Sequence, residues 1–253
     1  MKRIYILFLA ITFLMVPVAG VHAQQENQFT KGYVEVIDGC KIVLNGCLNI
    51  RSGPGIGYSR VHVLRIGAVL YVDKSVTDDT DRVWYRVVPT PGSHPERVTT
   101  EWYIAAEFVV PVTVPPEPAK DPSKKIVVDL SDQTLTAYQG DKIFMKVSVS
   151  TGRAATPTFP GRFTILWKTP SRYMQGPIPG AADISGKLLT DVYDLPGVPW
   201  DMYFTVGGAA FHGTYWHNDF GKKHSHGCVN LTVKDSYKLY GWAAVGTRVI
   251  VQP

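Results

Sequence analysis

The sequence predicts a mainly β protein: a small N-terminal β-barrel, a proline-rich linker, and a β-rich C-terminal domain with one short helix. Three observations support this fold class. Short segments alternate apolar and polar residues with period two between turn residues, which is typical of strands in antiparallel sheets. Residues 111–123 hold five prolines and break that pattern. Only residues 232–244 have the spacing of a helix with one apolar face.

Residues 1–23 have the parts of a signal peptide. Two basic residues precede an apolar run over residues 4–18, and Val21 and Ala23 are small residues at the two positions that a signal peptidase recognises. We expect cleavage after Ala23 and export to the cell envelope (periplasm or cell wall) or secretion. An uncleaved segment would instead anchor the chain in a membrane, although it is shorter than the about 20 apolar residues of a stable span.

Charge argues against nucleic acid as a partner. Removing Lys2 and Arg3 with the signal peptide lowers the formal net charge from +5 to +3. No run of Lys or Arg is longer than two residues. Binding to a phosphate backbone requires a concentrated basic surface, so the sequence predicts no nucleic-acid partner.

Export has a consequence for the three cysteines, because thiols in an oxidising compartment tend to pair. Cys40 and Cys47 lie in a stretch with turn signals at Asp38-Gly39 and Asn45-Gly46, which suits a short hairpin. A disulfide between the two would stabilise the fold by about 2.5 kcal/mol. Two unpaired buried thiols are the alternative. In either case Cys228 has no partner.

The first domain is predicted over residues 31–110, as short strands joined by tight turns. The segment Ser52-Gly53-Pro54-Gly55 is a strong turn signal. Strands without an amphipathic helix favour a small barrel. Residues 111–123 then predict an extended, semi-rigid linker, because proline-rich chains are stiff.

The second domain is predicted over residues 124–253. Residues 126–152 alternate with period two and predict two consecutive hairpin-like strands. Residues 150–165 and 170–199 are rich in Gly and Pro, and they predict long loops of the kind that form lids or binding sites. The helix over residues 232–244 is expected to begin just after Cys228, with Val233, Tyr237 and either Tyr240 or Gly241 on one face.

Four of the seven histidines lie in the seventeen residues from His212 to Cys228. A metal site of His224, His226 and Cys228, with His212, is one interpretation, but the paired spacing of structural zinc sites is missing. A buried structural thiol is the second, although the Ser225–Cys228 segment is too polar for a core. A cysteine nucleophile is the third and explains the pattern best. An imidazole or a helix N-terminus near the thiol would lower its pKa.

Both domains resemble known families. His212-Gly213 followed by Ser225-His226-Gly227-Cys228-Val229-Asn230, with STG at 150–152 and TPTFPGRFTI at 156–165, resembles the YkuD-type L,D-transpeptidase catalytic domain. LNIRSGPG, WYRV and WYIAAEFV in the first domain resemble a bacterial SH3-type domain. The first resemblance implies cross-linking of peptidoglycan stem peptides. Acyl transfer through a cysteine thioester would release D-alanine from a tetrapeptide stem. The second implies a module that holds the enzyme to the cell wall.

The L,D-transpeptidase resemblance also implies roles for individual residues. Cys228 would be the nucleophile and His212 its general base, oriented by the backbone carbonyl of Gly213. The N–H groups of Gly227 and Cys228 would stabilise the oxyanion. Five side chains would contact substrate: Ser225, His226, Asn230, Tyr203 and Trp216. His226 has a structural alternative, bracing its loop, and Trp216 has one in wall packing.

Two points qualify these roles. Many members of the family carry Arg at the position of Asn230, and Asn cannot reproduce the two-pronged contact of Arg with a carboxylate. His217 and His224 match no required role and are expected to be solvated loop residues. No metal and no cofactor is predicted; the stem peptides, as acyl donor and acceptor, and the cell wall are the expected partners.

Two other functions remain open at this stage. A cell-wall cysteine peptidase also joins an SH3-type module to a Cys–His domain, but its cysteine usually precedes its histidine in the chain. A non-catalytic wall-binding protein would require that the second domain has decayed, and the motif residues are all present.

Overall fold

The computed structural model describes residues 29, 31–39, 48–90, 94–177, 182, 185–188 and 193–253. The predicted signal peptide and the predicted Cys40–Cys47 disulfide lie outside these residues. Cys228 is a free cysteine. In the part of the chain that the structure describes, every helix is too short or too polar to cross a membrane.

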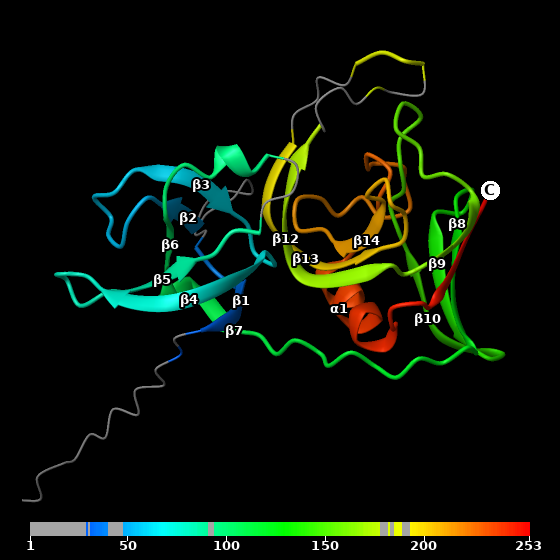
Figure 1. The fold of residues 1–253 in the computed structure, drawn as a ribbon, viewed down its shortest axis with the longest axis horizontal. Helices are drawn as coiled ribbons and strands as arrows, with labels where there is room; N and C mark the ends of the chain where they lie inside the picture. Colours follow the sequence, from blue (N-terminus) through cyan, green and yellow to red (C-terminus); the bar gives the residue numbers. More distant parts are fainter. Residues whose placement is uncertain are drawn as a thin grey trace, which may run out of the picture.

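The N-terminal part is one strongly curved sheet of seven strands, ordered β3-β2-β6-β5-β4-β1-β7 (Figure 1). The strands are β1 (Gly32–Val36), β2 (Leu48–Arg51), β3 (Arg60–Leu64), β4 (Val69–Thr77), β5 (Val83–Val87), β6 (Trp102–Ala105) and β7 (Val109–Pro111), with 3₁₀ turns η1 (Pro95–Arg97) and η2 (Ala106–Phe108). Its inner face buries Val34, Ile50, Leu64, Val72 and Ile104. This architecture is compatible with the small barrel that the sequence predicts.

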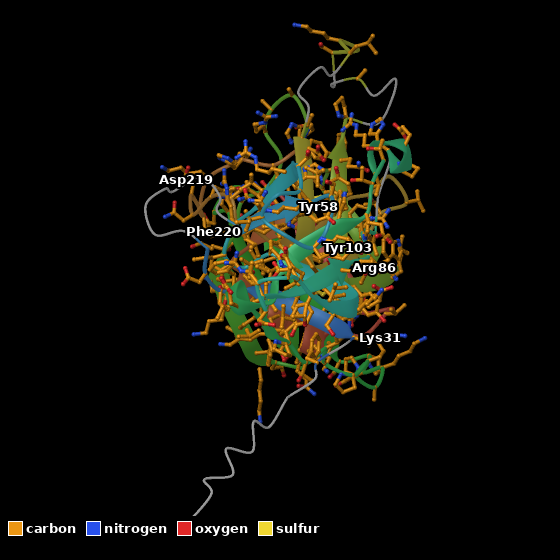
Figure 2. The ribbon with its side chains drawn as sticks, turned by 90° about the vertical axis from the view of Figure 1, so that its left-hand side faces the viewer. Lys31, Tyr58, Arg86, Tyr103, Asp219 and Phe220 are labelled. Atoms are coloured by element: carbon orange, nitrogen blue, oxygen red, sulfur yellow. The ribbon has the colours of Figure 1, made fainter. Side chains whose placement is uncertain are left out.

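The outer face of this sheet carries a charged network. Arg86 on β5 lies beside Tyr103 on β6 (Figure 2), its partner in the strand register. Arg86 donates to both carboxylate oxygens of Asp73, at 2.9 and 2.7 Å, and to Glu101 at 2.9 Å. Tyr103 donates to the other oxygen of Glu101 at 2.8 Å. The network fixes three neighbouring strands in register on the exposed face of the barrel.

Two sheets and one helix form the C-terminal part. One sheet has the order β10-β9-β8-β16-β11 and the other β12-β13-β14-β15. Their bounds are β8 (Lys124–Asp129), β9 (Thr134–Gln139), β10 (Lys142–Ser148), β11 (Gly161–Thr164), β12 (Trp167–Gly176), β13 (Tyr193–Tyr203), β14 (Ala210–Gly213), β15 (Val229–Leu231) and β16 (Arg248–Gln252). A shared core that includes Ile126, Leu135, Met202, Phe211 and Leu239 fills the space between both sheets and helix α1 (Val233–Trp242). The mainly β fold class with a short helix after Cys228 is therefore confirmed.

The predicted loop over residues 170–199 is wrong at both ends, because residues 170–176 and 193–199 belong to two long antiparallel strands, β12 and β13. The prolines of this segment obscured the period-two pattern from which strands are predicted. A proline cannot donate to a ladder, but β12 is the edge strand of its sheet, so Pro170 is tolerated there. A register shift between Arg172 and Met174 adds the irregularity that weakened the period-two pattern.

Helix α1 begins where its sequence provides a cap. The hydroxyl of Thr232 accepts from the N–H of Asp235 at 3.0 Å and donates to the Asp235 carboxylate at 2.7 Å. The buried face differs from the predicted one: Ser236, Leu239 and Tyr240 are buried, whereas Tyr237 is 37% exposed.

The proline-rich segment after β7 is bound along the C-terminal part (Figure 1). Glu117 accepts from Lys168 Nζ at 2.9 Å and from the N–H of Val245 at 2.7 Å. Lys168 also donates to the carbonyls of Tyr240 and Ala243, at 2.8 and 2.7 Å. The linker is extended, as its composition predicts, but these contacts fix its path against the helix end.

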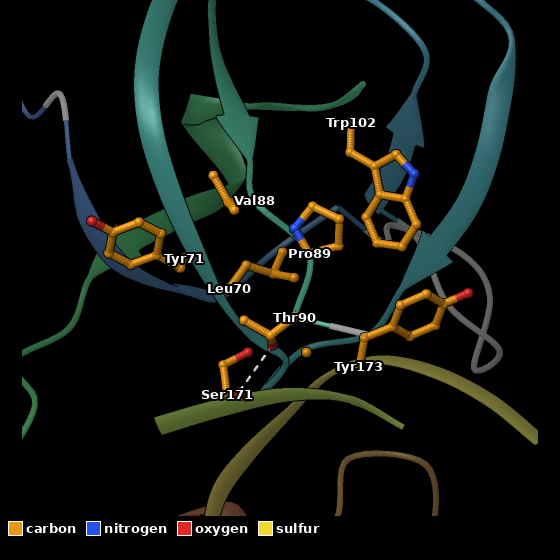
Figure 3. Close-up of a pocket in the computed structure, with 9 residues that line it drawn as sticks. Leu70, Tyr71, Val88, Pro89, Thr90, Trp102, Ser171 and Tyr173 are labelled. Carbon is orange, nitrogen blue, oxygen red and sulfur yellow. Dashed lines mark hydrogen bonds between the residues drawn. The ribbon is translucent and has the colours of Figure 1, made fainter. Parts of the chain in front are cut away.

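The two parts share a packed junction. Val69 of the barrel belongs to the C-terminal core, whereas Tyr173 of β12 belongs to the barrel core. Ser171 Oγ donates to Val69 O at 2.5 Å, and Thr90 Oγ1 donates to Ser171 O at 3.2 Å. The small cavity of about 10 Å³ between them (Figure 3) is lined by Thr90, Trp102, Ser171 and Tyr173 among others, and it is too small for a substrate.

Candidate active site

His212 and Cys228 come together because β14 and β15 pair in parallel. The register sets His212 opposite Asn230 and Phe211 opposite Val229. Residues two apart on a strand face the same side, so Cys228, immediately before β15, shares the side of Asn230 and His212. A parallel pair needs a long crossover, and residues 214–228 form it.

The crossover rests on the segment that contains the STG sequence. Thr151 O accepts from the N–H groups of His224 and Ser225, at 2.9 and 3.0 Å. Thr158 Oγ1 donates to Gly227 O at 2.9 Å and accepts from Gly152 N at 2.9 Å. Gly152 has no room for a side chain, because a Cβ there would lie 2.2 Å from a backbone oxygen. The segment that includes Thr151, Gly152 and Thr158 therefore supports the loop that carries Cys228, and we call this segment the cradle of the cysteine loop.

His212 is a buried, oriented imidazole, only 2% exposed. Its Nδ1 lies 3.0 Å from Gly213 O. A carbonyl only accepts, so Nδ1 carries the hydrogen and Nε2 keeps a free lone pair. Burial lowers the pKa of His212 to about 4, which outweighs the opposite effect of the Gly213 carbonyl. The ring is therefore neutral at neutral pH.

Gly213 also sets the distance to the helix. A Cβ on Gly213 would lie 2.6 Å from Ser236 Oγ and 2.8 Å from Pro199 Cγ. Only glycine lets α1 pack this closely against β14. This contact fixes the carbonyl that orients His212.

The surroundings of Cys228 favour the protonated thiol. Burial raises its pKa to about 11; the nearby Asp201 carboxyl adds to the effect, and the Ala210 backbone opposes it. Sγ lies 3.8 Å from Gly208 O. No hydrogen bond between Sγ and the His212 ring is present within the described residues.

This result corrects the expectation of a thiolate held by an imidazolium or by a helix N-terminus. The strand β15 separates Cys228 from α1, so the helix does not begin at the thiol. Burial disfavours both charged forms, which leaves a neutral thiol beside a neutral base.

The oxyanion donors expected at Gly227 and Cys228 are only partly available. Gly227 has φ +115°, a conformation that favours glycine. Its N–H, however, donates to Ser225 Oγ at 3.1 Å, and Ser225 Oγ donates to Cys228 O at 2.5 Å. Ser225 is 6% exposed. It braces the loop from inside, whereas the sequence predicts that it lines the substrate site.

Three other predicted contact residues surround the thiol at different depths. His226 is exposed; its Nε2 lies 2.6 Å from Arg153 Nη2, and its ring lies 5.1 Å from the ring of Tyr193. Tyr203 is 8% exposed and stacks on Trp167, with ring centroids 3.8 Å apart. Burial, with Asp201 and Cys228 nearby, raises the pKa of Tyr203 well above its ordinary value. Trp216 is half-buried, and its ring lies 5.7 Å from that of His212.

Asn230 and His217 form a pair that the sequence does not predict. Asn230 is 2% exposed, and its Nδ2 lies 3.0 Å from His217 Nε2. His217 is half-buried, with its ring 4.1 Å from that of His224, and burial lowers the pKa of His217 to about 4. The expectation that His217 is a solvated loop residue is therefore wrong, whereas His224 is exposed.

Asp201 is the functional candidate that sequence reasoning missed. It is fully buried, and neither carboxylate oxygen has a hydrogen-bond partner. Burial raises its pKa well above the ordinary value. Extending the register in which Met202 pairs with Phe211 sets Asp201 opposite His212. An acidic residue inside the apolar stretch VPWDMYF was the available sequence signal.

The metal interpretation of the histidine cluster gains no support from this geometry. Across residues 29–253, excluding the ranges that the structure leaves out, no three His, Cys, Asp or Glu side chains are grouped so that they could hold a metal ion. His224 and His226 point to different neighbours, His217 and Tyr193 respectively.

Comparisons with known proteins agree with the motif. A Bacillus licheniformis protein named as a YkuD L,D-transpeptidase is 25% identical over 132 residues; the alignment spans 51% of this chain and 66% of that protein, just under two thirds of its length. An L,D-transpeptidase structure from Mycobacterium smegmatis is 22% identical, with 68% of this chain and 91% of that one covered and a TM-score of 0.47. An L,D-transpeptidase structure from Stackebrandtia nassauensis is 29% identical, with 55% of this chain and 58% of that one covered and a TM-score of 0.40. The L,D-transpeptidase catalytic-domain family (YkuD) matches residues 123–251, just over half of the chain, and the chain belongs to this family.

Proposed function

We propose that this protein is an L,D-transpeptidase that cross-links peptidoglycan by acyl transfer through a thioester on Cys228. The observation that carries the proposal is the pairing of β14 with β15, whose register puts Cys228 on the same side as His212, an imidazole whose Nδ1–H is oriented by Gly213 O. Membership of the L,D-transpeptidase family supports the substrate class, the stem peptides of peptidoglycan as donor and acceptor.

The resting charges determine how the reaction begins. With a thiol pKa of about 11 and an imidazole pKa of about 4, an ion pair is strongly disfavoured before substrate arrives. We infer that His212 Nε2 takes the thiol proton as the sulfur attacks the amide carbon, so that deprotonation and attack are coupled. The imidazolium then protonates the departing amine of D-alanine, and a thioester remains.

The second half of the reaction uses the same base. An amine from a second stem attacks the thioester, His212 accepts its proton, and Cys228 leaves as the thiol. The Cys228 N–H is the proposed oxyanion donor. The Gly227 N–H would join it after Ser225 Oγ moves away, and each such donor is worth about 3 kcal/mol to the transition state.

We propose that the stem peptide enters between His226 and the Trp167–Tyr203 stack. His226 and Tyr193 are in contact, and the pKa of Tyr193 is raised chiefly by burial and further by Cys228, which supports their closeness to the thiol. Asn230 is buried against His217, so its contribution would be to hold the loop and not to bind a substrate carboxylate.

The barrel is proposed to hold the enzyme to the cell wall after export, as a bacterial SH3-type module would. A groove of about 490 Å³ on the barrel supports this proposal; its lining includes Arg86, Val88, Pro89, Val98, Glu101 and Trp102. A lining that mixes apolar and charged side chains suits a short peptide. Export through cleavage after Ala23 is part of the same proposal, and mass spectrometry of the exported protein tests it.

The central experiment incubates the exported protein and its Cys228→Ala variant with purified muropeptides that carry tetrapeptide stems. Cross-linked dimers with free D-alanine, absent for Cys228→Ala, are the expected result. Cleaved stems without dimers would overturn the proposal in favour of a cysteine peptidase. Binding to the wall without either product would identify a non-catalytic protein.

A covalent probe gives a second, independent measurement. A carbapenem added near neutral pH should form one adduct on the wild-type protein, and intact-mass analysis should find none on Cys228→Ala. A folded wild-type sample without an adduct would contradict the nucleophile assignment.

A further inference from the structure

The barrel contacts the active-site loop directly. Arg65 follows β3 in a turn that ends at Ala68, where the N–H of Ala68 donates to Arg65 O at 3.1 Å. From this turn the side chain reaches the other part of the molecule. Arg65 Nη1 donates to Trp216 O at 2.9 Å, a half-buried bond across 151 residues of sequence.

The turn is seated where the crossover loop leaves β14. Gly67, at φ +91°, leaves no spare room: a Cβ there would lie 3.0 Å from Val233 Cγ2 and 3.5 Å from Tyr215 Cβ. Tyr215 packs on the barrel core and donates to Pro196 O at 2.7 Å. The barrel therefore contacts both residues: its core packs against the side chain of Tyr215, and Arg65 binds the carbonyl of Trp216.

The indole of Trp216 connects these contacts with the imidazole of His212. Its ring lies edge-on to Tyr215, with centroids 5.0 Å apart, and 5.7 Å from His212 at an angle of 32°. The imidazole is held at Nδ1 by Gly213 O, and the indole limits how the ring can tilt about that bond. A shift of the carbonyl of Trp216 would move the indole and release this limit.

We propose that Arg65 is a positioning residue for acyl transfer, acting through Trp216 on the His212 ring, so that the barrel completes the catalytic centre of its own chain. The inference rests on the proposed function, because it concerns the base of that reaction. It makes the N-terminal domain part of the enzyme, in addition to any role in wall binding.

The test compares full-length Arg65→Met with wild type in carbapenem acylation, separating the limiting rate from the half-saturating concentration. Methionine keeps the apolar stem and removes the donor. We expect the limiting rate to fall about 10-fold, within the 10²-fold that a misplacement of about 1 Å can cost. Arg65→Lys should recover part of the rate, because an ammonium can still donate to the carbonyl.

Two comparisons distinguish positioning from general stability. Arg82→Met removes an arginine that pairs with Glu107 on the exposed surface of the barrel, so it should leave the limiting rate unchanged. Trp216→Leu keeps the backbone acceptor and removes the ring. Its limiting rate should therefore fall by as much as that of Arg65→Met, and the limiting rate of the double variant should fall little further. Trp216→Leu also keeps the test valid if Arg65→Met does not fold.

The outcomes separate the two proposals. A wild-type protein that forms no adduct contradicts the proposed function itself. A reactive wild type with unchanged limiting rates in Arg65→Met, or in Trp216→Leu where the first variant is unfolded, overturns the positioning role alone. A lower melting temperature with a normal limiting rate would assign Arg65 to structure only.

Discussion

The Nδ2 of Asn230 lies 3.0 Å from Nε2 of His217, which makes the buried amide a donor to a neutral imidazole. The contact occupies a side chain for which the sequence predicts contact with substrate. It also ties the strand that follows Cys228 to the loop that precedes it. Burial is the main cause of the lowered pKa of His217, and the amide of Asn230 is a hydrogen-bond partner suited to the neutral ring.

Asn230→Asp tests this pair with almost no change in shape. A carboxylate cannot donate to His217 Nε2 but attracts its protonated form, so the His217 pKa should rise from about 4. In the wild type the folded pKa lies below the ordinary value of about 6.5, so stability is lost as the pH falls from about 6.5 to 4. The variant should lose less of its stability over that interval.

An NMR titration of the His217 ring and urea unfolding at pH 5 and 7 provide the measurements. Asn218→Asp, which adds the same charge on an exposed neighbour, is the matched control. An unchanged His217 pKa in Asn230→Asp would contradict the assignment.

The resting thiol should titrate far above neutral pH. Its pKa of about 11 means that about one molecule in 10⁴ is ionised at pH 7. Alkylation by iodoacetamide, which involves no proton transfer to a leaving amine, should therefore be slow at pH 7 and should rise steadily to pH 10. Thiolate absorbance near 240 nm measures the same ionisation. A titration midpoint near pH 7 would establish a preformed ion pair with His212.

Asp201→Asn should make the thiol more acidic. When ionised, the Asp201 carboxyl contributes to the raised pKa of Cys228, whereas asparagine cannot ionise and keeps the volume. The absorbance titration should shift to lower pH, and alkylation at pH 8 should become faster. Asp141→Asn, at an exposed hairpin tip, should change neither. An equal shift in both variants would indicate a general charge effect and refute a local one.

Gly152→Ala should destabilise the cradle of the cysteine loop. A Cβ at this position would lie 2.2 Å from Thr156 O and 2.4 Å from Thr158 N, both backbone atoms that cannot rotate away. We expect a loss of about 1–3 kcal/mol in urea unfolding, typical of overpacking. Gly207→Ala, whose Cβ would approach nothing closer than 3.9 Å, should cost far less. Equal free energies of unfolding for the two variants would mean that the cradle accommodates the added Cβ without loss of stability.

His212→Asn should show how burial of the base affects acid stability. The folded pKa of about 4 against an unfolded value of about 6.5 implies about 3 kcal/mol of stability that is lost as the pH falls between those values. Asparagine does not titrate there, so the variant should lose less stability from pH 7 to pH 4 while transfer activity disappears. Parallel unfolding curves for both proteins at each pH would contradict this account.

Much of the fold could be predicted because local sequence patterns determine it. Period-two alternation identified a mainly β chain, and the capping pair Thr232 and Asp235 lies at the start of the predicted helix. The motif residues from His212 to Cys228 are close in sequence, so the candidate nucleophile and base could be named without a structure. The β12–β13 hairpin could not, because its prolines lie on the edge strand β12 and in the part of β13 outside its pairing with β14, and local sequence does not define which strands pair there.

By itself, the sequence determined which chemical groups are available: the thiol of Cys228, the imidazole of His212 before it, and the glycines that let the backbone pass close by. Only the tertiary structure decided their state. It buried His212 and partly buried Cys228, and this desolvation favours the neutral form of both groups. It also set Asp201 opposite His212 and brought Arg65 to Trp216 across the domain junction. Protonation depends on desolvation and on neighbours from distant strands, and these are fixed by packing between segments, which no local pattern records.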